Sequence, residues 1–204
     1  MTPPREPQRV VIVDSGGANL ASVRIAFERL GVEACVSGQA DTIRAADRVV
    51  LPGVGAAGVA MQRLCDLGLE HVIPELRQPV LGICVGMQLL YESSEEGSTR
   101  CLGVFDGAVE ALPTSAGVRV PHMGWNRLLP RAASPLLADL GDDAHAYFVH
   151  GYAASGGAGL VAACQHGEEF AAIVTLRNFT GVQFHPERSG AVGAQLLRNW
   201  LEAA

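Results

Sequence analysis

The chain has 204 residues, of which 49% are hydrophobic and 18% are charged, and its formal net charge is −6. This length and composition suit one globular domain with a full core and exclude a disordered chain. The acidic balance argues against a nucleic-acid surface, which would need a basic stripe. No apolar run approaches the ~18 residues of a membrane-spanning helix.

The start of the chain, Met1–Arg9, holds three prolines and two arginines but no apolar run. We therefore expect no secretory signal there, and we predict a disordered tail over 1–8 before a single domain over 9–204. The five cysteines are irregularly spaced and form no C-x-x-C pair. This pattern favours neither a disulfide framework nor a zinc site, and it fits a reducing cytoplasm.

The first half of the domain alternates apolar runs with helical patterns, which predicts βαβ units and a parallel sheet covered by helices. Strands are expected at 9–14, 32–36, 48–51 and 79–83, and helices at 19–30 and 57–67. Ligands of such sheets bind beyond the carboxyl ends of the strands. The segments that follow the third and fourth strands therefore form the candidate site. The Ser- and Glu-rich segment 92–100 is predicted to be a solvated loop without a function.

From Gly103 onward the pattern changes to short alternating segments separated by Gly- and Pro-rich turns. These predict antiparallel or mixed strands at 104–112, 118–120, 125–129, 144–149, 160–165 and 171–176. A last strand at 181–184 precedes a final helix at 189–201.

Cys84 stands where a buried strand is expected to turn into a helix, and Gly82 and Gly86 bracket it. This G-x-C-x-G pattern is typical of a nucleophile elbow, in which small neighbours allow a sharp strand-to-helix turn. Because a helix N-terminus favours the thiolate over the thiol, the pattern predicts a cysteine that attacks an acyl group. The alternative is a buried cysteine that merely closes a βα unit. This segment alone does not decide between them.

A cysteine nucleophile needs a base and a group that orients the base. His185 ends an apolar strand, and Glu187 lies two residues further on, so both side chains can leave the same edge. We expect His185 to take the thiol proton and later to protonate the leaving amine, while Glu187 orients the ring. The His-Pro-Glu run could also be only a turn before the last helix, but its combination with the cysteine elbow favours the catalytic interpretation.

Two glycines follow the third predicted strand in Leu51–Gly55. Backbone N–H groups in such a segment can turn toward a ligand without a side chain in the way. The N–H groups of Val54, Gly55 and Val85 could form an oxyanion hole, where one donor is typically worth ~2.7–4 kcal/mol in the transition state. Taken alone, the segment is better explained as an ordinary βα loop that caps the next helix. Together with the cysteine elbow and the His-Pro-Glu run, the oxyanion hole becomes the favoured interpretation.

These three features, in this order, resemble the class I (triad-type) glutamine amidotransferase family over Val10–Leu201. Within that family the resemblance is to the glutaminase subunits of imidazole glycerol phosphate synthases, the HisH type. It is carried by VPHMGWN at 120–126, by Tyr147–His150 and by GVQFHPERSG at 181–190. The PHMGWN string is highly specific. Without the resemblance, its residues would be taken for the core of a β region.

The resemblance implies an α/β fold with a flavodoxin-like, mostly parallel central sheet, flanking helices and a mixed strand region in the second half. It implies the triad Cys84, His185 and Glu187, which would release ammonia from glutamine and leave a glutamyl thioester for water to hydrolyse. The residues expected to bind glutamine are Gly53, Gly55, Gln88, Gly151 and Tyr152. The resemblance implies no cofactor and no metal.

Ammonia would pass to a separate HisF-type (βα)₈ cyclase subunit in a heterodimer, which would form imidazole glycerol phosphate and AICAR in histidine biosynthesis. The residues implied on or near the partner-facing side are Asn19, His122, Met123, Trp125, Asn126, Tyr147 and Arg188. In this family the ligand of the cyclase commonly activates the glutaminase, so the isolated chain should be nearly silent.

Three positions depart from the family pattern, and none belongs to the triad. They are the first βα loop, Ser15-Gly16-Gly17-Ala18, then Gly151 where Ser or Thr is usual, and Arg188 where Lys is common. Three other functions stay open. The chain could supply ammonia to anthranilate, aminodeoxychorismate or pyridoxal phosphate synthesis, act alone as a γ-glutamyl hydrolase, or serve as a docking scaffold without activity.

Overall fold

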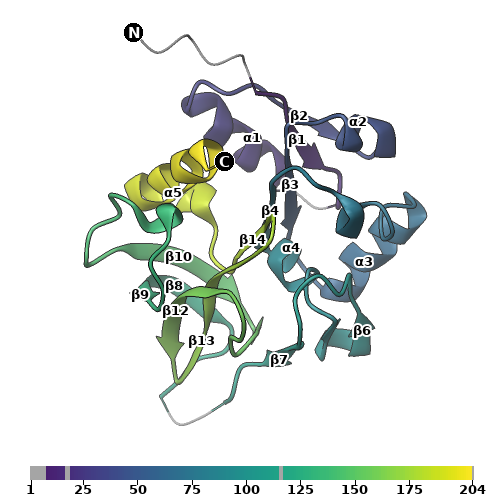
Figure 1. The fold of residues 1–204 in the computed structure, drawn as a ribbon. Coiled ribbons are helices and arrows are strands. Elements are labelled where there is room, and N and C mark those ends of the chain that lie inside the picture. Colours follow the sequence, from purple (N-terminus) through teal and green to yellow (C-terminus); the bar gives the residue numbers. More distant parts are fainter. Residues whose placement is uncertain (1–7, 17–18, 115–116, 204) are drawn as a thin grey trace, which may run out of the picture.

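The structure is a computed structural model that describes residues 8–16, 19–114 and 117–203, and a sheet of eight strands runs through it (Figure 1). The strands are β1 (Val10–Val13), β2 (Ala34–Ser37), β3 (Arg48–Gly53), β4 (Val80–Cys84), β9 (Leu129–Pro130), β12 (Leu160–His166), β13 (Glu168–Leu176) and β14 (Phe179–Val182). Their order is β2-β1-β3-β4-β14-β13-β12-β9. The predicted tail over 1–8 lies outside the described residues except for Gln8, as do Gly17 and Ala18 of the first loop.

The first five strands in this order are parallel, and the remaining three join them antiparallel. The parallel part has the order of a flavodoxin-like sheet, with β1 and β3 next to each other at the switch point. Ligands bind beyond the carboxyl ends of strands in such sheets. The predicted α/β class with a mostly parallel sheet is therefore confirmed.

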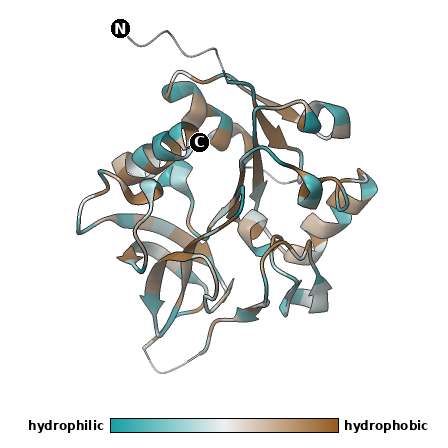
Figure 2. Ribbon diagram, in the orientation of Figure 1, coloured by the Kyte–Doolittle hydropathy of each residue, from teal (hydrophilic) through white to brown (hydrophobic). Residues whose placement is uncertain are grey.

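In the described ranges, five α-helices accompany the sheet: α1 (Leu20–Arg29), α2 (Ala40–Arg44), α3 (Ala57–Asp66), α4 (Val85–Gln88) and α5 (Gly190–Glu202). Figure 1 shows α1 and α5 on one side of the parallel strands and α3 and α4 on the other. Phe27 of α1 meets Trp200 of α5 edge to face at 6.1 Å. In Figure 2 the central strands are hydrophobic, whereas the helices alternate hydrophobic and hydrophilic residues, as expected for helices that bury one face.

Two small sheets complete the described part of the fold. One pairs β8 (His122–Arg127) with β10 (His145–His150), and the other has the order β11-β7-β5-β6. The strands of the second sheet are β5 (Ser93–Ser94), β6 (Thr99–Arg100), β7 (Ala108–Ala111) and β11 (Tyr152–Ala153). Short 3₁₀ helices lie at Ile73–Glu75, Glu96–Ser98, Pro135–Leu137 and Pro186–Arg188. No helix in the described ranges has the length and apolarity that a membrane crossing requires.

The sequence predictions fail mainly in the second half. Residues 117–120 are described but form no strand, and the strand predicted at 104–112 shrinks to β7. Val104 and Phe105 are buried in a turn, where both backbone N–H groups donate to the carbonyl of Leu90. Their burial, and not strand pairing, explains the apolar pattern. The short helix α2 was not predicted.

The turn predicted at Cys84 is confirmed, because β4 ends at this residue and α4 begins at the next. The backbone of Cys84 has φ 54° and ψ −113°, a left-handed conformation that is strained for a residue with a side chain. Three glycines let the chain pass so closely here. A Cβ on Gly82 would lie 2.8 Å from the carbonyl oxygen of Gly86, and one on Gly53 would lie 2.6 Å from the Gly86 nitrogen.

A methyl group at Gly86 should be severely destabilising, because its Cβ would overlap the carbonyl oxygen of Leu51. We expect Gly86→Ala to lower the free energy of unfolding by about 3 kcal/mol or more, the upper range for overpacking a core. Urea unfolding followed by circular dichroism measures this. Gly151→Ala is the matched control, since its Cβ would meet only a Val120 methyl at 3.8 Å. Equal stability of the two variants would contradict the close approach of β3 and α4.

Candidate active site

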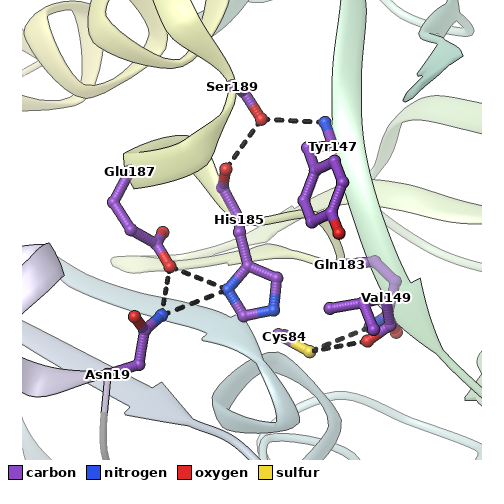
Figure 3. Close-up of polar contacts among 8 residues, drawn as sticks. All are labelled: Asn19, Cys84, Tyr147, Val149, Gln183, His185, Glu187 and Ser189. Carbon is purple, nitrogen blue, oxygen red and sulfur yellow. Dashed lines mark hydrogen bonds and ion pairs between the residues drawn. The ribbon is translucent and has the colours of Figure 1, made fainter. Parts of the chain in front are cut away.

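Cys84 is 3% exposed, and its sulfur contacts two polar groups, one from β10 and one from the residue that follows β14. The thiol donates to the carbonyl of Val149 at 3.8 Å, and the side-chain amide of Gln183 donates to the sulfur, also at 3.8 Å (Figure 3). The Gln183 amide is itself held by Gln88, whose Nε2 donates to Gln183 Oε1 at 3.0 Å. The sulfur is therefore fixed by the elbow and by a buried amide, which can stabilise negative charge on it.

His185 and Glu187 meet as predicted, with the ring of His185 between Glu187 and Cys84 (Figure 3). The distance from His185 Nδ1 to Glu187 Oε1 is 2.8 Å, and the two side chains are 3% and 0% exposed. A carboxylate accepts, so Nδ1 carries a proton and Nε2 is left for the cysteine. The side chain of Asn19 also donates to Glu187 Oε1. Among the described residues, Glu187 Oε2 is buried and has no hydrogen-bond partner.

The segment that carries His185 is fastened to strand β10. The backbone N–H of His185 donates to the carbonyl of Tyr147 at 2.9 Å. The hydroxyl of Ser189 accepts from the Tyr147 N–H at 2.9 Å and donates to the His185 carbonyl at 2.7 Å (Figure 3). These bonds hold the ring in one place against β10.

Burial on its own would lower the pKa of His185, but hydrogen bonds and charge interactions with Cys84 and Glu187 outweigh burial and raise the pKa to about 10. The ring is therefore disposed to hold a proton beside Cys84. A thiolate–imidazolium pair is the reactive form of a cysteine nucleophile.

A cavity of about 250 Å³ opens beside the cysteine. The residues that line it are Val54, Gly55, Cys84, Val85, Gln88, Glu96, Val149, His150, Gly151, Tyr152 and His185. It thus brings together all the predicted oxyanion residues and most of the predicted glutamine-binding residues. Gly53 differs, because it is buried against Val85 and Gly86 and does not line the cavity. A larger hollow of about 950 Å³, lined in part by Val10, Leu30 and Leu201, contains none of the predicted site residues.

The predicted oxyanion segment is held in place at Pro52 and Gly53 but has space around it at Gly55. The buried hydroxyl of Ser15 donates to the carbonyl of Pro52 at 2.5 Å, and Gly53 packs on the elbow. Gly55 has φ +83°, and a Cβ there would meet nothing within 4 Å. The backbone is therefore fixed up to Gly53 and has room to turn at Gly55, where only glycine takes this conformation at little cost.

Glu96 is a cavity residue that the sequence analysis missed. The prediction of a solvated loop over 92–100 is wrong at this position, because the 3₁₀ turn at Glu96–Ser98 brings the carboxylate to the start of α3. There Glu96 Oε2 accepts from the Ala57 N–H at 2.7 Å. The Ser- and Glu-rich composition gave no signal for this. Gln183 was also missed, although a glutamine within an apolar strand pattern could have suggested a buried polar role.

The predicted partner-facing residues fall into two groups. Met123 and Trp125 are 65% and 57% exposed, and Trp125 meets Tyr147 edge to face at 6.0 Å. Arg188 is exposed as well, whereas Asn19 and Asn126 are partly buried. A surface role is wrong for the side chain of His122, which is 4% exposed, because β8 turns its even-numbered residues inward.

The chain from residue 11 to 204 matches the family model "Glutamine amidotransferase class-I". It is 55% identical over 193 residues to the imidazole glycerol phosphate synthase subunit HisH of Xanthomonas campestris pv. campestris (strain 8004), which covers 95% of this chain and 96% of the relative. The subunits of the same name from Xanthomonas oryzae pv. oryzae (strain MAFF 311018) and Xylella fastidiosa (strain Temecula1) are 56% and 54% identical, with the same coverage.

Two solved structures share the fold at lower identity. One, described as a glutamine amidotransferase, has a TM-score of 0.73 and 21% identity, covering 95% of this chain and 97% of that chain. PurLQS from Thermotoga maritima has a TM-score of 0.72 and 20% identity, covering 97% of this chain and 99% of that chain. The predicted fold class is confirmed by these neighbours.

Two buried histidines should make stability fall with acid. Burial, with the charge of His166 acting in the same direction, lowers the pKa of His122 to about 4, and burial lowers the pKa of His150 to about 3. Both rings are neutral in the folded chain while the unfolded chain binds protons near pH 6.5, so stability is lost as the pH falls below 6.5. His185 adds no loss of stability in this pH range. Its raised pKa keeps it protonated in the folded chain, and below pH 6.5 the ring is also protonated in the unfolded chain.

We expect the free energy of unfolding to fall by about 3 kcal/mol between pH 6.5 and pH 5, roughly half of it from each ring. Urea unfolding at several pH values measures the slope. In His122→Gln, which removes one of the two titrating rings, the slope should be roughly halved, whatever the absolute stability of the variant. A slope that is flat in the original chain would contradict the burial of neutral rings.

Proposed function

Because this chain belongs to the class I glutamine amidotransferase family, we propose that it is the glutaminase subunit of an imidazole glycerol phosphate synthase. The observation that carries the glutaminase chemistry is the strained Cys84 elbow facing the buried His185–Glu187 pair across one small cavity. The identity of about 55% over nearly the whole chain supports the choice of synthase. We also propose that residues 9–204 form one domain.

Cys84 supplies the nucleophile. Its thiolate attacks the side-chain carbonyl carbon of glutamine, and the oxygen that becomes negative is stabilised by backbone N–H groups at Val54, Gly55 and Val85. When the C–N bond breaks, His185 gives its Nε2 proton to the leaving nitrogen, which departs as ammonia. A glutamyl thioester remains on Cys84.

Water then attacks the thioester. His185, now neutral at Nε2, takes a proton from the water, and the C–S bond breaks to release glutamate and restore the thiolate–imidazolium pair. Glu187 accepts from Nδ1 of His185 at 2.8 Å and so keeps the ring oriented, with Nε2 toward the reacting atoms.

The far end of the cavity offers groups for the amino-acid part of glutamine. Gln88 donates both amide hydrogens within the protein, to the carbonyl of Tyr152 at 2.8 Å and to Gln183 at 3.0 Å. Its carbonyl oxygen is left to accept from a ligand. Together with the Glu96 carboxylate it suits the α-ammonium group, while Gly151 and Tyr152 contribute backbone.

The partner is a cyclase subunit of the HisF type, and the two chains form a heterodimer in which ammonia passes to the cyclase for histidine biosynthesis. The exposed Met123 and Trp125, the neighbouring Tyr147 and Arg188 provide the contact surface. An aromatic and a methionine exposed side by side are typical of the centre of a protein interface. The five cysteines are free thiols, which fits our assignment of the pair to the cytoplasm.

Glutamate release from glutamine tests this function. We expect almost none from the chain alone and a steep rise with a cyclase subunit of the HisF type and its nucleotide ligand. Cys84→Ala should reduce the coupled rate at least about a thousandfold while still binding the cyclase. Equal activity with and without the cyclase would indicate a stand-alone γ-glutamyl hydrolase instead, and silence with an active cyclase would indicate a docking scaffold.

Glu96→Gln tests the recognition of the α-ammonium group. The amide can still accept from the Ala57 N–H, so the fold is kept, but the charge is lost. We expect the KM for glutamine to rise about tenfold or more, as the loss of one charge-assisted hydrogen bond of about 1.5 kcal/mol predicts. Glu95→Gln is the matched control, because Glu95 is exposed and does not line the cavity. Similar KM values for the two variants would contradict the role of Glu96.

A further inference from the structure

Two histidines that the proposed chemistry does not use lie buried between strand β8 and the glutamine cavity. His122 of β8 and His150 of β10 stand opposite each other in the strand pair and are 4% and 6% exposed. Phe148 stacks on His122 at 5.0 Å, and Phe170 meets the ring of His150 at 4.9 Å. Buried polar rings in such an apolar cluster must be hydrogen-bonded to each other or to the backbone.

The hydrogen bonds of these rings run in one direction only. His150 Nδ1 lies 2.9 Å from the carbonyl oxygen of Tyr152, which can only accept, so His150 carries its proton on Nδ1. His150 Nε2 must then accept from His122 Nδ1, which lies 3.0 Å away. His122 therefore also has its proton on Nδ1, and its Nε2 must accept.

Asn126 supplies the donor that this direction needs. Its Nδ2 lies 3.2 Å from His122 Nε2 and also donates to the Gln165 carbonyl at 2.9 Å. Its Oδ1 accepts from the backbone N–H of Arg127 at 2.8 Å, which fixes the orientation of the amide. The donor required at Asn126 and the acceptor required at the Tyr152 carbonyl therefore give the same direction to all three hydrogen bonds, from Asn126 through His122 and His150 to Tyr152. A second proton on either ring would place two N–H groups opposite each other, and neither could accept a hydrogen bond.

This series of hydrogen bonds ends at the Tyr152 carbonyl, which also holds Gln88 of the proposed substrate site. The Tyr152 carbonyl accepts from Gln88 as well as from His150, and Gln88 continues through Gln183 to the sulfur of Cys84. His150 itself lines the cavity. A shift of His122 would therefore reach the backbone and the amide that meet glutamine.

The same strand carries the proposed contact surface on its other face. Along β8 the buried His122 and the partly buried Asn126 alternate with the exposed Met123 and Trp125. Because the side chains of a strand alternate between its two faces, a partner bound to the exposed residues would contact the same strand that carries His122 and Asn126.

We propose that Asn126, His122 and His150 form a relay of fixed tautomers and that His122 is a positioning residue, which holds the Tyr152 carbonyl and Gln88 in place for glutamine. The relay links the partner-facing strand to substrate binding, and in this respect it rests on the proposed function. The competing explanation is that the two rings only fill the core.

The tautomers are tested by ¹⁵N NMR of the whole chain with labelled histidine at neutral pH. We expect His122 and His150 to be neutral and both protonated on Nδ1. Protonation of either ring on Nε2, or a charged ring, would overturn the relay. This measurement does not depend on any enzymatic activity.

The functional role is tested with Asn126→Asp, which has nearly the same shape but offers no donor to His122. We expect the proton of His122 to move to Nε2, and the KM for glutamine in the complex with the cyclase to rise about fivefold or more while kcat changes less than twofold. His166→Gln is the matched control, because the ring of His166 stacks on His122 at 4.0 Å but, among the residues that the structure describes, is hydrogen-bonded to the Arg119 carbonyl alone. It should leave both constants within twofold.

The outcomes separate the two proposals. The positioning role would be overturned if Asn126→Asp changed the His122 tautomer but not the KM for glutamine. It would also be overturned if Asn126→Asp and His166→Gln changed the KM equally. In either case the two rings would only fill the core. Absence of glutamine hydrolysis by the original chain with an active cyclase would overturn the proposed function, while the NMR result would still decide whether the relay exists.

Discussion

The site depends on a backbone conformation that only close packing can hold. Cys84 has φ 54°, a left-handed value that a residue with a side chain adopts at a cost of about 1–3 kcal/mol. This cost is offset by the close packing of β3, β4 and α4. Their backbones approach so closely that Gly53, Gly82 and Gly86 have no room for a Cβ. The same contacts fix Gly53, so the oxyanion segment begins at a defined point relative to the sulfur. The same packing therefore holds the proposed nucleophile and the start of the proposed oxyanion segment.

The other half of the site is held by strand β10. Its backbone bonds to His185 and Ser189 and accepts from the thiol at Val149, and its last residue, His150, lines the cavity. Strand β10 pairs with β8 along its whole length. It therefore lies between β8 and the residues of the proposed triad. A partner bound to the exposed side of β8, as we propose, would therefore contact a strand that is hydrogen-bonded to the one that holds His185.

Much of the first half could be predicted from the sequence, because its signals are local. Apolar runs alternating with helical patterns indicate parallel βα units, and the glycines around Cys84 indicate a sharp turn whatever the distant contacts are. The pairing of His185 with Glu187 was also predictable, since a single residue, Pro186, separates them. What the sequence could not show was that Cys84 and His185 meet, because that depends on β4 and β14 being neighbours. The family resemblance supplied this link.

The errors share one cause, which is that long-range contacts decide the role of a residue. Glu96 has the sequence context of a solvated loop, yet a 3₁₀ turn brings its carboxylate to the cavity. His122 belongs to a string that marks a partner surface, yet the alternation of β8 turns it inward. Val104 and Phe105 have a strand-like pattern because they are buried in a turn. Composition and periodicity report burial, and they do not report what a buried group meets.

The most direct test of the central claim is covalent trapping of the nucleophile. The chain, in complex with its cyclase and nucleotide ligand, would be treated with a glutamine analogue that has an electrophilic diazoketone in place of the amide, and the labelled peptide would be identified by mass spectrometry. We expect one adduct, on Cys84, which excess glutamine prevents. The exposed Cys35 and Cys65 and the buried Cys101 and Cys164 serve as internal controls. Labelling of another cysteine at the same rate, or none at Cys84 while glutamine is still hydrolysed, would contradict the account.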